Sequence, residues 1–163
     1  MAERTYVDEI IFDKKAVVDF TIKYTDGWGK ENERFLVKSI PHEINENTII
    51  DGDDIIVSDD ELHIVLDYPL KHTVDRIFVK KNGFTKKDVL IAIFRAYVEI
   101  YDEEEGFVKS VRISDVKPHC NLMTRMTEPG RHGIWGHSLT DLIIVGFAYI
   151  EGHSNYIVPC VRT

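Results

Sequence analysis

Cysteine is scarce in this chain of 163 residues, which holds only Cys120 and Cys160. Two cysteines are too few for a disulfide framework at this length, so we expect reduced thiols and a reducing compartment. Long apolar runs are also lacking, because charges or glycines interrupt every stretch well short of the roughly 18–20 residues of a membrane span. Segment 1–15 has no basic region followed by an apolar run, so we expect no secretory signal. These features predict a soluble protein of the cytosolic type.

Several motifs that indicate a particular ligand or reaction are missing from the sequence. It contains neither of the glycine-rich phosphate-binding patterns, G-x-x-x-x-G-K-[ST] and G-x-G-x-x-G. The G-x-S-x-G turn that exposes a nucleophilic serine is missing too, as is the C-x-x-C pair that makes a zinc prediction strong. The sequence therefore gives no direct indication of a nucleotide, a cofactor or a reaction, and we expect no cofactor.

Charge is uneven along the chain, whose formal net charge is −8. Acidic residues dominate residues 1–105, whereas residues 106–163 carry a small basic excess. An acidic chain repels a phosphate backbone, so we expect no general binding of nucleic acid. A local cluster could override this expectation; it consists of Lys80, Lys81, Lys86 and Lys87. We interpret these lysines mainly as a solubilising face, with phosphate contact at a helix N-terminus as the alternative.

Strand patterns dominate the sequence. Alternating apolar residues predict a strand at 16–24, which should form a hairpin with a return strand at 33–40. Between 41 and 70, short apolar pieces alternate with turn residues, and no helix is predicted there. A further strand is expected at 75–83, and the stretch 142–150 is apolar on both faces, as in a central strand. The last strand, 156–161, contains Pro159, which predicts that this strand lies at an edge or that it ends there.

One helix is predicted over about residues 86–103. Thr85 and Asp88 have the spacing of a capping box, and Phe84 and Val89 have that of a hydrophobic staple. Gly106 is expected to end the helix, so the acidic run 102–105 would lie at a frayed, solvated terminus, or else form an acidic surface for a cation or a basic partner. With 44% hydrophobic and 29% charged residues, the chain is predicted to form one α+β domain, 1–163, with a mostly antiparallel sheet.

The segment 130–142, GRHGIWGHSLTDL, gathers glycines, histidines, a tryptophan and an aspartate. Its glycines, Gly130, Gly133 and Gly136, recur every third residue, which suits positive φ angles in a folded-over loop. We interpret the segment as a structural corner. Ile134 and Trp135 are expected to point inward, and His137 and Asp141 to fix the backbone.

Two chemical alternatives use the same segment. The spacing of Cys120, His132 and His137, completed by Cys160, could supply four zinc ligands, although no paired C-x-x-C spacing supports it. Alternatively, Asp141 could orient the imidazole of His137 as the general base of a hydrolase. The nucleophile would then be a water molecule or one of three side chains, and the sequence does not select among Ser138, Thr140 and Cys120.

Two segments, 83–105 and 132–152, resemble a family of small uncharacterised proteins encoded by giant DNA viruses, the marseillevirus and mimivirus relatives, and by some protists. The matching positions are Gly83, Phe84, Thr85, Ile100, Tyr101, Gly133, Ile134, Trp135, Gly136, His137, Asp141 and Leu142. His132 stands where that family usually has a tyrosine, so a role for that hydroxyl is not available here. The resemblance covers roughly the last half of the chain and brings no assigned chemistry.

The resemblance implies a viral protein located in the particle or the host cytoplasm, with the host nucleus as a further location. It also implies action early in infection. Combined with the lack of a convincing catalytic set, it predicts a non-enzymatic interaction or virion-associated protein. The expected partner is a viral or host protein, or a second copy in a homodimer. A hydrolase using His137 and Asp141, or a small zinc- or nucleic-acid-binding module, are the alternatives.

Overall fold

A computed structural model describes residues 17–21, 24–25, 28–32, 34–46, 48–114, 132–134, 137–150 and 152–163. Its principal sheet has the strand order β1-β10-β11-β7-β8, and β4 also pairs with β10. The strand bounds are β1 Val17–Thr21, β4 Phe35–Leu36, β7 Glu61–Leu66, β8 Val74–Val79, β10 Ile143–Ile150 and β11 His153–Arg162. Every described pairing in this sheet is antiparallel except that of β11 with β7. The prediction of an α+β fold with a mostly antiparallel sheet is confirmed.

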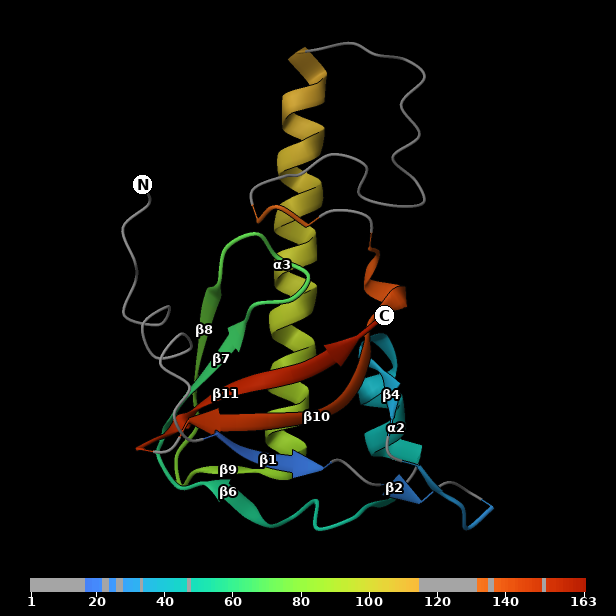
Figure 1. Ribbon diagram of the computed structural model, residues 1–163, viewed down its shortest axis with the longest axis vertical. Helices are drawn as coiled ribbons and strands as arrows, with labels where there is room; N and C mark the ends of the chain where they lie inside the picture. The colour runs from blue at the N-terminus through green and yellow to red at the C-terminus, as the bar shows by residue number, and fades with distance from the viewer. Residues whose placement is uncertain are drawn as a thin grey trace.

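Smaller elements surround the principal sheet. Strand β2 (Tyr24–Thr25) lies between β3 (Glu31–Asn32) and β5 (Thr48–Ile49), and β6 (Ile55–Val57) pairs with β9 (Phe84–Thr85). The short helical segments are η1 Val37–Ser39, α2 Ile40–Glu46 and η2 Leu139–Asp141. Figure 1 shows α2 and β4 together on one side of the long helix, close to the C-terminus.

Helix α3, Lys86–Ser114, packs on one face of the sheet and crosses behind β10 and β11 (Figure 1). On β7 every second side chain enters the core, namely Leu62, Ile64 and Leu66. They share one buried cluster with a stripe of α3 that includes Val89, Leu90, Ile93, Ala96, Tyr97 and Ile100. A period of two on the strand thus meets a period of three to four on the helix. The side chains of His63 and Val65, on the other face of β7, are buried as well.

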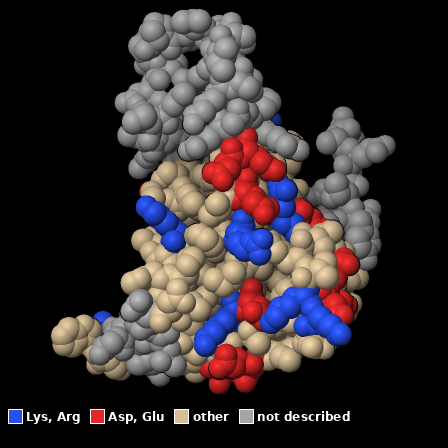
Figure 2. Space-filling view, turned by 180° about the vertical axis from the view of Figure 1, so that it is seen from behind, with Lys and Arg blue, Asp and Glu red and all other residues tan. Residues whose placement is uncertain are grey.

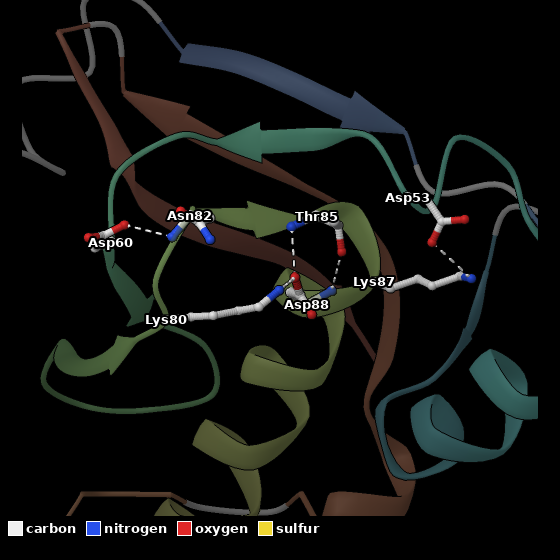
Figure 3. Close-up of polar contacts among 7 residues, drawn as sticks. All are labelled: Asp53, Asp60, Lys80, Asn82, Thr85, Lys87 and Asp88. Carbon is white, nitrogen blue, oxygen red and sulfur yellow. Dashed lines mark hydrogen bonds and ion pairs between the residues drawn. The ribbon is translucent and has the colours of Figure 1, made fainter.

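The start of α3 is capped as the sequence predicts. The backbone amide of Thr85 donates to the Asp88 carboxylate at 2.9 Å, and the amide of Asp88 donates to the Thr85 hydroxyl at 3.2 Å (Figure 3). Lys80 forms an ion pair with the same carboxylate. Partial burial of Asp88 favours its neutral form, but the bonds from Lys80 and Thr85 outweigh this and hold the pKa of Asp88 below its usual value.

Replacing Asp88 with asparagine is expected to lower the free energy of unfolding by about 1 kcal/mol near neutral pH, because the cap loses its charged acceptor. The pKa of Asp88 is lowered on folding, so its stabilisation is present above about pH 4 and is lost as the pH falls through the folded-state value. The difference between wild type and Asp88→Asn in urea unfolding should therefore shrink below about pH 4. Asp53→Asn removes the exposed partner of Lys87 and serves as the control, with no comparable loss. A difference for Asp88→Asn that stays constant with pH would contradict the assignment.

The end of α3 lies beyond the predicted one. The helix passes through Gly106 and continues to Ser114, and its last turns project beyond the sheet (Figure 1). A glycine inside a helix costs only about 1 kcal/mol relative to alanine, so it does not by itself stop a helix. The acidic run 102–105 therefore lies within the helix, and the prediction of a frayed terminus there is wrong.

Two predictions for the N-terminal half are wrong in part or in whole. The expected hairpin over 16–40 forms only next to its tip, where β2 pairs with β3. Beyond the tip, β1 pairs with β10 and β4 pairs with a different part of β10. A helix, α2, occupies part of the region 41–70, for which no helix was predicted. Helix α2 has only 7 residues, and its first residue, Ile40, is buried. Such a short helix has too few residues to show a helical period in the sequence.

Strand β10 is central, as predicted, because it lies between β1 and β11. The prediction that Pro159 marks an edge strand or the end of the strand is wrong, since β11 lies between β10 and β7 and continues to Arg162. Strand β11 pairs with β7 only at Tyr156 and Ile157, so Pro159 stands beyond this pairing, where its missing N–H leaves no β7 acceptor unmatched. In the described part of α3 and the shorter helices, no segment is long and apolar enough to span a bilayer.

Candidate functional site

A buried carboxylate of α3 holds the segment around Gly133 in place. Glu104 is 0% exposed, and its two oxygens accept hydrogen bonds from the backbone amides of His132 at 2.6 Å and Ile134 at 3.1 Å. Two amides of one short segment that donate to a single carboxylate make a strong, charge-assisted contact. Part of the acidic run therefore binds the protein's own backbone, which neither sequence interpretation of that run anticipated.

The neighbouring glutamate forms a second link to the same segment. Glu103 lies 2.7 Å from Nε2 of His132 and forms an ion pair with Arg76 of β8. Partial burial of Glu103 favours its neutral form, but the contacts with His132 and Arg76 outweigh it, so the pKa of Glu103 is held below its usual value. Glu103 thus connects α3 with both β8 and the corner.

Gly133 has the positive φ angle that its place in a glycine-permitted corner predicts, +67°. A Cβ at this position would lie 2.3 Å from Cβ of Lys71, so the chain there has no room for a side chain. The carbonyl of His132 accepts the amide of Lys71 at 3.0 Å, which ties the corner to the loop between β7 and β8. Gly130 and Gly136 lie outside the described residues.

His137 and Asp141 make different contacts from those a catalytic pair needs. The Asp141 carboxylate accepts the backbone amide of Ser138 at 3.0 Å, as in a capping box at the start of η2. Nε2 of His137 lies 3.4 Å from the hydroxyl of Tyr68, and the carbonyl of His137 accepts the hydroxyl of Tyr101 at 3.3 Å. Burial, with a contribution from Asp141, raises the pKa of Tyr101, so its phenol keeps the proton that it donates. Two of these contacts, from Asp141 to Ser138 and from Tyr101 to His137, hold the backbone of this segment in place.

The structure describes only some of the residues that the zinc alternative requires. Cys120, Trp135 and Gly136 lie outside the described residues. His132 directs Nε2 to Glu103, and Cys160 lies on β11. Among the described residues, no three His, Cys, Asp or Glu side chains are grouped so that they could share a metal ion.

The four lysines near the start of α3 are largely engaged with the protein itself. Lys80 pairs with Asp88 and Lys87 with Asp53 at 3.3 Å (Figure 3). Lys86 is buried, and its Nζ lies 3.4 Å from the carbonyl oxygen of Ile50, whereas Lys81 is exposed. Figure 2 shows that both signs of charge alternate over the face seen from behind. This local arrangement does not form a continuous basic surface for a phosphate backbone.

Among the described strands, β8 is an outer strand of the principal sheet and has part of its backbone facing away from β7. The amide of Lys80 donates to the carbonyl of Asp60 at 2.9 Å, in register with the β7–β8 pairing. Because bonded and non-bonded pairs alternate along an antiparallel ladder, Asp75, Ile77 and Val79 point their amides and carbonyls away from β7. The side chains of Ile77 and Val79 are also 56% and 77% exposed. Such an edge is a template for another strand.

A groove of about 460 Å³ runs between this edge and α3. Residues 77–80 form one side, and the other side consists of Phe84, Asp88, Ile91, Ala92 and Arg95. We call it the β8–α3 groove. Arg95 stands over the ring of Phe78 with 5.5 Å between its guanidinium carbon and the ring centroid. The groove therefore combines an apolar surface, an available strand edge and a cation.

The sheet beneath the edge is held firmly. His63 on β7 lies between two carboxylates, with Nδ1 2.8 Å from Asp75 of β8 and Nε2 2.7 Å from Glu61. Its ring stacks on Tyr156 of β11, with centroids 4.2 Å apart. These contacts join three neighbouring strands, so the edge is formed before any partner arrives, and less order has to be imposed on binding.

Comparison of the chain with protein-family models, with curated proteins and with solved structures finds no match. Sequence reasoning placed the corner and the capped helix, but it missed Glu104 and the β8–α3 groove. A carboxylate in an acidic run gives no signal that it will be buried. The exposed Ile77 and Val79 follow the same alternating pattern as a buried strand, so the sequence does not distinguish an edge from an interior strand.

Proposed function

We propose that this protein is a non-enzymatic interaction protein that binds a protein partner along β8. The observation that carries the proposal is the combination of outward-facing backbone on β8, the exposed Ile77 and Val79, and the β8–α3 groove beside them. An extended segment of a partner added to this edge would gain main-chain hydrogen bonds and bury apolar side chains at once. A second copy of this chain is the other partner that an open edge admits.

The hydrolase alternative receives less support from the site. In the hydrolase alternative, Asp141 orients the ring of His137 so that the ring can act as a general base. In the structure, the carboxylate of Asp141 accepts a backbone amide instead. The ring of His137 lies against that of Tyr68, with centroids 5.7 Å apart. The corner therefore supports a structural role for His137 and Asp141, and the proposal places function at β8 instead.

We further propose a viral setting, in which the protein resides in the particle or the host cytoplasm, or enters the host nucleus, and acts early in infection. The support is the resemblance of segments 83–105 and 132–152 to proteins of giant DNA viruses and some protists. Mass spectrometry of purified particles and of fractionated infected cells would test this setting independently of the binding surface.

The binding surface is tested by capturing partners from infected-cell lysate with the full chain and mapping cross-links by mass spectrometry. Ile77→Lys introduces a charge in the middle of the edge and is expected to reduce recovery of the bound protein at least about tenfold. Ile55→Lys is the matched control, because Ile55 is 58% exposed but lies on β6, outside the groove. Equal recovery by both variants, or cross-links that avoid β8, would refute the proposal.

A further inference from the structure

We infer that the partner is an extended segment of another protein in which a carboxylate lies two residues from a large apolar side chain, and that this carboxylate pairs with Arg95. The inference rests on the proposed function, because it specifies what the β8–α3 groove recognises. It follows from the spacing of groups along the groove, from their charges and from the symmetry that a second copy would impose.

The spacing of the groove matches that of a strand. Ile91 and Arg95 are one helical turn apart on α3, a rise of about 6 Å. Side chains at positions i and i+2 of a strand lie on one face about 6.6 Å apart. A strand paired with β8 can therefore place one side chain against Ile91 and the next on that face against Arg95. The pattern it needs is apolar-x-acidic or its reverse.

The charges select an acidic group. Lys80 and Asp88 form an ion pair with each other, so together they leave no net charge in the groove. Arg95 is exposed and stacks on Phe78, and no carboxylate in the described part of the chain forms an ion pair with it. A partner carboxylate would form an ion pair with Arg95, whose planar guanidinium can donate two parallel hydrogen bonds to it.

The opposite face of the edge requires apolar or neutral residues at the intervening positions. Ile77 and Val79 direct their side chains away from α3, next to His63 and Asp75, and both are largely exposed. A partner strand covers them with its alternate side chains, because successive residues of a strand point to opposite faces. The segment therefore has an apolar–acidic face toward α3 and an apolar face toward Ile77.

A second copy of this chain fits the same edge less well. An isologous antiparallel pairing of β8 with β8 has its two-fold axis near the middle of the strand, so equivalent residues meet on the same face. Arg95 stands over Phe78, close to that axis, and the pairing would bring the two Arg95 side chains together. Like charges at that position oppose the dimer, whereas a heterologous acidic segment relieves the unmatched charge.

The test is a selection of displayed random peptides of about twelve residues, long enough for one strand, against the full-length protein. The selection is repeated against Arg95→Glu, which reverses the charge, and against Lys38→Glu, which makes the same change at an exposed lysine on η1 outside the groove. Circular dichroism of each variant establishes that the fold is retained. Affinities of individual peptides are then measured by fluorescence polarisation at two salt concentrations.

Wild type and Lys38→Glu are expected to enrich peptides with an apolar-x-acidic pattern, and Arg95→Glu to enrich a basic residue in the acidic position. A selected acidic peptide should bind Arg95→Glu about tenfold more weakly than wild type. Binding that Ile77→Lys abolishes but Arg95→Glu leaves unchanged would overturn this inference while the proposed function stands. Two other outcomes would overturn the inference of an acidic partner segment. The first is that the selected peptides bind Ile77→Lys as well as they bind the wild type. The second is that no peptides are enriched, while the wild type forms a stable dimer that Ile77→Lys dissociates.

Discussion

Replacement of Glu104 by alanine is expected to lower the free energy of unfolding by about 3 kcal/mol, because two buried backbone amides lose their common acceptor. Those amides, on His132 and Ile134, lie 2.6 and 3.1 Å from the carboxylate oxygens. Glu104→Gln keeps the size of the side chain and one acceptor oxygen, so its loss should be smaller than that of the alanine variant. Urea unfolding followed by circular dichroism measures both losses.

Another acidic residue of the same run, Asp102, provides the control for Glu104. Asp102 lies two positions earlier on α3 and is exposed, and Asp102→Ala removes the same charge without uncovering a buried amide. Its effect on the free energy of unfolding should stay within about 0.5 kcal/mol. If Glu104→Gln is as stable as the wild type, the carboxylate does not anchor the corner, and the structural interpretation of the segment 130–142 loses its main support.

Gly83→Ala is expected to lower the free energy of unfolding by about 2–3 kcal/mol. Gly83 has φ +85°, a conformation that costs a residue with a side chain about 1–2 kcal/mol. In addition, a Cβ there would lie 2.5 Å from the carbonyl oxygen of Val57, which belongs to the strand that pairs with β9. The substitution should separate β6 from the start of α3, and a thermal melt or urea unfolding would record the loss.

Gly152→Ala separates the two contributions to that loss. Gly152 has nearly the same φ, +86°, but a Cβ there would meet nothing within 4 Å. Only the backbone strain remains, so the expected loss is about 1 kcal/mol. Equal losses for Gly83→Ala and Gly152→Ala would show that the close approach to Val57 carries no energetic weight.

The parts of the fold that the sequence predicts correctly depend on residues close together in the chain. The capping box of Thr85 and Asp88 spans four residues, and its two reciprocal hydrogen bonds form as expected. The apolar stretch of β10 indicates its central place, and the strand lies between β1 and β11. Gly133 takes the positive φ that a glycine in a corner permits. In each of these cases the relevant physics is local, or it depends only on burial.

The parts that the sequence does not predict depend on partners far away in the chain. Strand β1 shows the same alternation whether it pairs with β4 or with β10, so the sequence does not specify its neighbour. The burial of Glu104 depends on residues about thirty positions later that bring their amides to it. Pro159 suggests an edge until it is known that β7 has already diverged from β11 at that point.

The order of strands in the sheet has a consequence for synthesis on the ribosome. Strand β1 comes early in the chain, yet its partner β10 includes Ile150, which pairs with Val17. Until β10 has been synthesised, the nascent β1 lacks the strand with which it pairs in the described part of the chain, whereas β7, β8 and the start of α3 are local and able to associate sooner. Closure of the central strands therefore follows the synthesis of residues 143–150, and a chain truncated before β10 leaves β1 without this partner strand.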